Sequence, residues 1–231
     1  MKALRAIAGL IAAAAAAFLA PAPASADLRL SELIVDLQPG KQTRDDIEIW
    51  NDSPDRAFVA VEPREIVNPA LANQSIFRDP DPEKLGLLVS PSRLILESGQ
   101  RKLIRVATVV APGTRERTYR ITVKPVVGGV QADNSGLKIL VGYDVLVLVR
   151  PRQSNPDVSG VRSGRSLHFD NRGNVSVELI DGRQCGSSRT VCTPLPAKRL
   201  YPGASWTVSL PTDAPAEYTL KSPARADHKV Y

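Results

Sequence analysis

The two cysteines of the sequence, Cys185 and Cys192, are the residues whose type and spacing most directly allow chemistry. They enclose the short segment 186–191, a separation that suits a disulfide across a hairpin. A redox or metal-binding pair is the alternative, but redox pairs usually have C-x-x-C spacing and no histidine lies nearby in the sequence. In an exported protein, where disulfides persist, we expect this pair to be a structural disulfide.

The other groups that could support catalysis or bind a metal are sparse. The two histidines, His168 and His228, have no nucleophile or carboxylate that the sequence assigns to them. No Gly-x-Ser-x-Gly elbow occurs, and no helical segment follows Gly128-Gly129, so a phosphate loop is not indicated. We therefore expect no enzyme activity, no metal and no cofactor.

Residues 1–26 resemble a cleavable signal peptide. Lys2 and Arg5 precede an apolar stretch, which ends at prolines and is followed by the small residues Ala24-Ser25-Ala26. The alternative is an uncleaved membrane anchor, for which the apolar stretch is short. Cleavage would remove two positive charges from the formal net charge of +6. The remaining charges are spread along the chain, so we expect an exported protein that does not bind nucleic acid.

The chain after residue 26 shows the period-two alternation of β-strands. Residues 45–50 alternate in this way and end at a turn, Asn51-Asp52-Ser53-Pro54. Further strands follow every 8–15 residues between Pro, Gly and Asn turns, which is typical of a β-sandwich. We expect a loop without helix at residues 68–86, a bend or sheet edge at Pro91 and a turn at Asp181-Gly182. The last strand is expected at Ala216–Leu220.

A polar, proline-bearing segment at residues 151–156 follows the most apolar strand and is typical of a short hinge. The predicted organisation is therefore a signal peptide (1–26), a first domain (27–150), the hinge (151–156) and a second domain (157–231). The predicted fold class is all-β, with two immunoglobulin-like sandwiches. The second domain is small for a sandwich, so a disulfide would be useful there.

Four segments in register resemble the periplasmic pilus chaperones (PapD-like family). Residues 47–53 are an early strand that ends in an Asn turn, and residues 88–106 are a Ser-Pro strand, a Gly turn and a second strand. Residues 115–125 are a strand with Glu, Tyr and a closing Pro, and residues 146–151 are a last strand that enters the hinge. The resemblance implies a periplasmic chaperone that binds pilus subunits and delivers them to an outer-membrane usher.

The resemblance also gives a role to the apolar strand at residues 139–149. Such a strand is costly at an exposed edge because it templates aggregation. In this family it is donated to a subunit, whose sandwich lacks its final strand. The expected donor side chains are the odd-numbered set, Ile139, Val141, Tyr143, Val145 and Val147, and the alternative set is the opposite face with Leu140, Leu146 and Leu148. The alternative is an ordinary central strand that is buried on both faces.

One departure from the family concerns the cations that bind the subunit's terminal carboxylate. The alignment puts Leu146 at the family's Lys position and Glu32 or Leu33 at its Arg position, so this chain lacks the usual pair. Arg120 and Lys124 share one face of a strand and could form a relocated clamp. Arg29 is a third candidate. The alternative is that all three are ordinary solvated charges.

A second class of function fits the same strands, because a fold does not determine a function. The chain could be a two-domain envelope or surface adhesion protein without chaperone activity. The two classes differ at the edge, since a chaperone needs residues 139–149 accessible and an adhesion protein would cover them. Because an exposed strand edge can pair with another chain, we also expect the free chaperone to self-associate through this strand.

Overall fold

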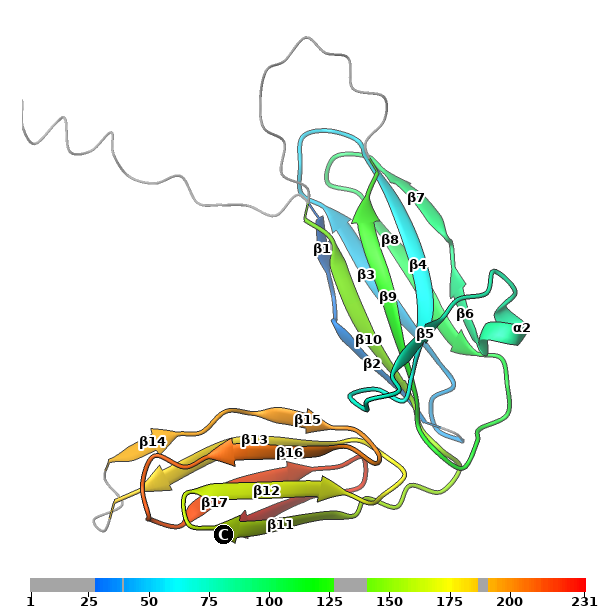
Figure 1. Cartoon of the computed structure of the whole chain (residues 1–231). Helices are drawn as coiled ribbons and strands as arrows, with labels where there is room; N and C mark the ends of the chain where they lie inside the picture. Colours follow the sequence, from blue (N-terminus) through cyan, green and yellow to red (C-terminus); the bar gives the residue numbers. More distant parts are fainter. Residues whose placement is uncertain (1–27, 39, 127–140, 187–190) are drawn as a thin grey trace, which may run out of the picture.

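The protein is built almost entirely of β-strands, which form two domains set at an angle to each other (Figure 1). The computed structural model describes residues 28–38, 40–126, 141–186 and 191–231. Within these residues, no helix has the length and apolar character needed to cross a bilayer. The predicted all-β class with two sandwich domains is confirmed. The predicted signal peptide lies outside the described residues.

The first domain packs two sheets face to face. A four-stranded sheet has the order β1-β3-β8-β6, and a six-stranded sheet has the order β2-β10-β9-β4-β5, with β7 also paired to β4. The four-stranded sheet consists of β1 (Leu28–Leu30), β3 (Arg44–Asn51), β8 (Arg101–Thr108) and β6 (Leu87–Ser90). The six-stranded sheet consists of β2 (Ile34–Leu37), β10 (Tyr143–Val149), β9 (Arg117–Pro125), β4 (Ala57–Val67), β5 (Ser75–Phe77) and β7 (Arg93–Leu96).

Alternation along these strands places every second side chain in the core between the sheets. In β3, Ile47 and Ile49 are fully buried, whereas Glu48 between them lies on the outer face. Val145 and Val147 of β10 join the same core. Each buried side chain of this size stabilises the fold by about 1.5–3 kcal/mol relative to an exposed one. The core therefore decides which face of each strand is left for other contacts.

The segment of residues 87–96 is divided at Pro91. The residues before it form β6, which pairs with β8, and those after it form β7, which pairs with β4 in the other sheet. Proline has no N–H to donate to a ladder, so the chain changes sheets at this residue. The bend expected at Pro91 is confirmed.

The expectation of a helix-free loop at residues 68–86 is wrong. This segment contains β5 and a one-turn helix, α2 (Pro82–Leu85). Pro82 occupies the first turn, where its missing N–H breaks no helical hydrogen bond. The Asp81 side chain caps the turn, and Gly86 ends it with a φ of 85°. The turn carries Leu85 into the core of the first domain.

The second domain is also a sandwich. Its three-stranded sheet consists of β11 (Val158–Ser163), β12 (Ser166–Asn171) and β16 (Ser205–Ser209). Its five-stranded sheet consists of β14 (Cys192–Pro194), β13 (Val177–Cys185), β17 (Ala216–Lys221), β18 (Ala226–Val230) and β15 (Lys198–Leu200). The core centres on Phe169. Its ring centroid lies 5.9 Å from that of Trp206, 5.4 Å from that of Tyr218 and 5.2 Å from that of Tyr231.

Two sequence-based expectations for this domain are corrected. The turn predicted at Asp181-Gly182 is an irregularity inside β13, where the register with β17 shifts. Asp181 has a φ of 53°, and a Cβ at residue 182 would lie 2.4 Å from the Tyr218 ring. The same residue types that make turns also make bulges, so the local signal did not distinguish them. The chain also continues beyond the predicted last strand into β18.

The predicted disulfide is confirmed. Cys185 and Cys192 are bonded at an S–S distance of 2.03 Å, and they are paired across β13 and β14. The bridge joins an edge strand to the centre of the five-stranded sheet. It therefore supports the smaller of the two predicted domains.

Candidate functional site

The first half of β10 has an open side. Residues 143–149 all pair with β9 on one side, but on the other side β2 begins only at Ile34, which lies opposite Leu146. Among the described residues, no strand lies beside residues 143–145 on that side. The predicted donor strand is thus divided into an open part, which ends near Val145, and a part that is paired on both sides (Figure 1).

The side chains of the predicted donor set lie in different environments. Val141 is 59% exposed, whereas Val145 and Val147 are fully buried in the domain's own core. Tyr143 packs against that core and donates a hydrogen bond from its hydroxyl to the Leu28 carbonyl oxygen at 2.5 Å. Ile139 lies outside the described residues. Val141 is therefore the described member of the set whose side chain is free to enter a partner.

The open part of β10 carries a charged residue, Asp144, on its outer face. Arg64 Nη2 contacts Asp144 Oδ1 at 2.8 Å, and Arg120 Nε lies 3.9 Å from Oδ2. The Thr122 hydroxyl lies 3.3 Å from Oδ1. Arg120 also donates to the Asp144 backbone carbonyl at 3.3 Å. The edge that the sequence predicts to be donated is therefore bordered by two arginines from β4 and β9.

Arg120 also reaches the second domain. Its guanidinium lies close enough to Tyr201 to act on the pKa of that hydroxyl. Burial raises the pKa of the Tyr201 hydroxyl, although the charge of Arg120 acts in the opposite direction. The hydroxyl is therefore neutral at neutral pH. Arg120 thus lies between the open strand edge and the place where the two domains meet.

The domains are joined at Arg150, directly after β10. Its Nε and Nη2 donate to the two carboxylate oxygens of Asp36, each at 2.8 Å, and its Nη1 donates to Glu116. Glu116 in turn accepts a hydrogen bond from the Ser176 backbone N–H of the second domain at 2.9 Å. Burial disfavours the charged guanidinium, but the paired carboxylates outweigh it and raise the pKa of Arg150.

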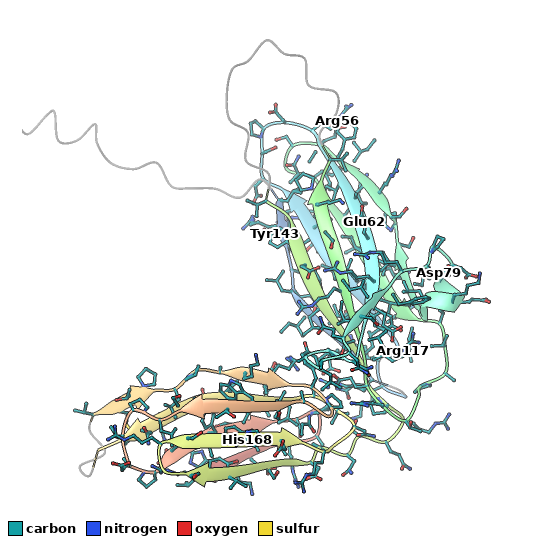
Figure 2. The ribbon with its side chains drawn as sticks, viewed as in Figure 1. Arg56, Glu62, Asp79, Arg117, Tyr143 and His168 are labelled. Atoms are coloured by element: carbon teal, nitrogen blue, oxygen red, sulfur yellow. A yellow bond between two sulfur atoms is a disulfide. The ribbon has the colours of Figure 1, made fainter. Side chains whose placement is uncertain are left out.

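Both histidines lie at the surface of the second domain, where His228 Nε2 is 3.8 Å from Glu217 Oε2. His168 lies on the second domain, away from Tyr143 and β10 (Figure 2). Its Nδ1 lies 2.8 Å from the Thr207 hydroxyl, and its Nε2 lies 3.3 Å from Asp170 Oδ1, all at an exposed sheet surface. In the described part of the chain, no group of three or more His, Cys, Asp or Glu side chains could hold a metal ion.

The comparison with solved structures covers most of the chain. A class 5 fimbriae chaperone, CfaA, superposes with a TM-score of 0.63 at 20% identity, over 88% of this chain and 98% of that one. The Salmonella enterica SafB chaperone, solved with the SafA pilin, gives a TM-score of 0.64 at 16% identity, over 91% and 99%. This chain has the two-domain fold of the fimbrial chaperones.

Sequence comparison also finds fimbrial proteins. A CS1 fimbrial subunit of Escherichia coli is 26% identical over 171 residues, covering 69% of this chain and 71% of that protein. A CFA/I fimbrial subunit of Escherichia coli is 25% identical over 178 residues, covering 74% and 73%. No protein-family model matches the chain.

Within this fimbrial-chaperone fold, the two positions expected for the missing cations are neighbours. The Leu146 backbone N–H donates to the Leu33 carbonyl oxygen at 2.9 Å, because β2 and β10 run side by side. Leu33 and Leu146 carry apolar side chains, and Glu32, the alternative for the Arg position, carries an acidic one. Arg120 lies directly opposite Leu146 on the other neighbouring strand. A cation is therefore present one strand away from the expected position.

The other two candidate cations lie apart from Arg120. Lys124 lies two residues after Thr122 on β9, and its Nζ pairs with the Glu62 carboxylate at 3.0 Å. Arg29 lies in the four-stranded sheet, where it pairs with Asp52 and its guanidinium carbon is 5.9 Å from the centroid of the Trp50 ring. The structure does not bring Arg29, Arg120 and Lys124 together.

Arg64 is a residue of this site that the sequence analysis missed. It lies directly opposite Arg120 in the pairing of β4 with β9. The two residues are far apart in the sequence, so only the strand register brings them together. The sequence places Glu62 and Arg64 on the same face of β4, two residues apart. This spacing indicates a charged outer surface but does not identify a partner for Arg64.

Proposed function

We propose that this protein is a non-enzymatic periplasmic chaperone that binds pilus subunits by offering them the open edge of β10. The observation that carries the proposal is that residues 143–145 pair on one side only, next to exposed Val141. A strand added to such an edge gains main-chain hydrogen bonds, and alternate side chains provide specificity. The fold shared with SafB, which was solved with a pilin, supports this role.

The direction of the free backbone groups supports strand addition. The N–H groups of Leu146 and Arg150 donate to carbonyl oxygens of Leu33 and Leu37, each at 2.9 Å. Because backbone groups alternate sides along a strand, Asp144 presents its N–H to the open side, next to its carbonyl, which accepts a hydrogen bond from Arg120 at 3.3 Å. A subunit strand would lie beside residues 143–145, in line with β2, and continue toward Val141. Residues 146–149 would hold β10 in place through their pairing with β2 and β9.

The donor set Ile139, Val141, Tyr143, Val145 and Val147 remains the proposed recognition strand. Its members would act in two ways, since Val145 and Val147 anchor the strand in the chaperone's core and Val141 enters the subunit. Arg120, Lys124 and Arg29 remain the proposed cations for the subunit's terminal carboxylate. We further propose export through residues 1–26, delivery of the subunit to an outer-membrane usher and self-association of the free chaperone at the same edge.

The test is recovery of a complex from the periplasm. The full chain would be co-expressed with candidate pilus subunits, and the complex would be purified through a tag on the chaperone. Val141→Asp should abolish recovery, because a carboxylate would enter an apolar groove. Val161→Asp is the matched control, since Val161 is 65% exposed on β11 of the second domain.

The proposed clamp is tested in the same assay. Replacing Arg120 and Lys124 with Ala should abolish recovery of the complex, and undiminished recovery would exclude these two side chains as the anchor. If the unchanged protein recovers no pilus protein, that result would count against the chaperone role itself. Equal recovery with Val141→Asp would count against strand addition at this edge.

A further inference from the structure

Asp144 lies in a site that is built for a carboxylate. Arg64 contacts its carboxylate at 2.8 Å and also donates to the Thr122 hydroxyl at 2.5 Å. Arg120 approaches the second oxygen at 3.9 Å. Two guanidinium groups and a hydroxyl thus converge on one carboxylate, which is the chemistry by which proteins recognise carboxylate ligands.

The arginines are held more firmly than the carboxylate that they contact. The side chains of Arg64 and Arg120 are 18% and 34% exposed, whereas that of Asp144 is 45% exposed. Arg64 and Arg120 are paired opposite each other at the centre of the six-stranded sheet, while Asp144 lies on the half-open strand. Exchange of the carboxylate would therefore leave the two arginines in place.

The charges at this site do not balance. Arg64 and Arg120 together carry two positive charges against one negative charge on Asp144. The neighbouring acids are engaged elsewhere, Glu62 with Lys124 at 3.0 Å and Glu65 with Arg117 at 2.7 Å. Other surface pairs of the domain, such as Arg105 with Asp46, join one arginine to one carboxylate. The site therefore keeps a net positive charge while Asp144 occupies it.

The site also lies where a partner strand would have to end. A strand beside residues 143–145 cannot continue past Ile34, because β2 occupies the next positions along β10. Neighbouring strands are about 4.8 Å apart, so the terminus of the added strand would lie about two strand spacings from β9. Arg120 lies on β9 opposite Leu146, at this level of the sheet.

We infer that Arg64 and Arg120 form the binding site for a carboxylate of the bound subunit, and that Asp144 occupies this site in the free protein. Asp144 is then an internal competitor, which a subunit carboxylate displaces when its strand pairs with β10. The inference rests on the proposed function for the identity of the partner. It assigns to Arg64 a role that the carboxylate anchor predicted from the sequence did not include.

The first experiment needs no subunit. The mature protein, labelled with ¹⁵N at its arginine side chains, would be titrated with acetate and followed by NMR. In Asp144→Asn, the Nε signals of Arg64 and Arg120 should shift at lower acetate concentrations than in the unchanged protein. Asp46→Asn is the matched control, because it frees Arg105 on the other sheet. Signals of Arg64 and Arg120 that acetate does not move in Asp144→Asn would overturn the site.

The second experiment uses the subunit that co-purifies with the chaperone. Asp144→Asn should bind it about two- to fivefold more tightly, the range expected from removing one partly exposed ion pair. Arg64→Gln should weaken binding by about tenfold, as for loss of a charge-assisted hydrogen bond. Unchanged affinity in both variants would overturn the inference while leaving strand addition intact.

The source of the carboxylate is identified with two forms of a peptide that matches the subunit's last strand. A peptide with a free C-terminus should bind more tightly than its C-terminal amide if the terminus is the ligand. Equal binding of both, with loss on replacement of an acidic side chain by its amide, would assign the ligand to that side chain. Equal binding of all forms would overturn the site. If the chaperone binds no pilus protein at all, the proposed function fails, and the acetate titration still decides the site.

Discussion

Asn51 and Asn171 make the same two local hydrogen bonds at equivalent places in the two domains. Each ends a strand and is buried. Each accepts from the backbone N–H two residues later, at 3.2 Å from Ser53 and 2.9 Å from Gly173. Each also donates its amide to the carbonyl four residues later, at 2.7 Å and 2.9 Å. One local device therefore closes a corresponding turn in both sandwiches.

Replacing either asparagine with alanine should destabilise its own domain. The turn carbonyls and N–H groups would lose their buried partner, at a cost of about 1–3 kcal/mol for each unsatisfied group. Urea unfolding of Asn51→Ala should shift the first domain, and that of Asn171→Ala the second. Asn73→Ala, at an exposed position, is the control and should leave both transitions unchanged. Equal shifts for all three variants would show that the turns do not depend on these side chains.

Removing the Arg150 guanidinium should weaken the joint between the domains. In Arg150→Ala, buried Glu116 would lose its cation, and breaking a buried pair on one side costs about 3–5 kcal/mol. Thermal unfolding should show a large decrease in Tm, with the domains unfolding in separate steps. Arg105→Ala, whose ion pair is exposed, is the comparison. A cooperative transition at the original Tm would contradict the role given to Arg150.

Reduction of the disulfide should act on the second domain alone. Closing a loop of this length restricts the unfolded chain by about 2.5 kcal/mol, so Cys185→Ser with Cys192→Ser should lower stability by that order. Urea unfolding of the double variant should resemble that of the unchanged protein in a reducing agent. The first domain contains no cysteine, and its transition should not move. A shift of that transition would indicate coupling through the joint at Arg150.

Stability should fall at alkaline pH because of Tyr218. Burial raises the pKa of its hydroxyl from 10.0 to about 12. Between these values the folded state holds a proton that the unfolded state has released, so the free energy of unfolding decreases as pH rises. The stabilisation is complete below about pH 10 and is lost through about pH 12.

The corresponding variant is Tyr218→Phe. It should be less stable at neutral pH by about 1 kcal/mol, because the hydroxyl donates to the Pro196 carbonyl oxygen at 3.1 Å. It should also lose less stability between pH 10 and 12 than the unchanged protein. Urea unfolding at several pH values measures both effects. A parallel decline in the two proteins would show that Tyr218 does not govern the alkaline limit.

Local patterns were sufficient wherever the cause of a structure lies within a few residues. Alternation predicted the strands, Asn51 predicted its turn, and the spacing of Cys185 and Cys192 predicted the disulfide. The same short-range signals misled where one residue type serves two purposes. Pro82 starts a helical turn instead of preventing it, and Asp181-Gly182 forms a bulge instead of a turn.

The candidate site could be predicted only in part. The apolar character of residues 139–149 identified the strand, but it did not show that β2 covers its second half or that Val145 and Val147 face inward. The pairing of Arg64 with Asp144 joins residues 80 positions apart, and that of Arg150 with Asp36 joins residues 114 positions apart. Strand order and register bring such pairs together, because a charge on one strand has no defined partner until the neighbouring strands are in place.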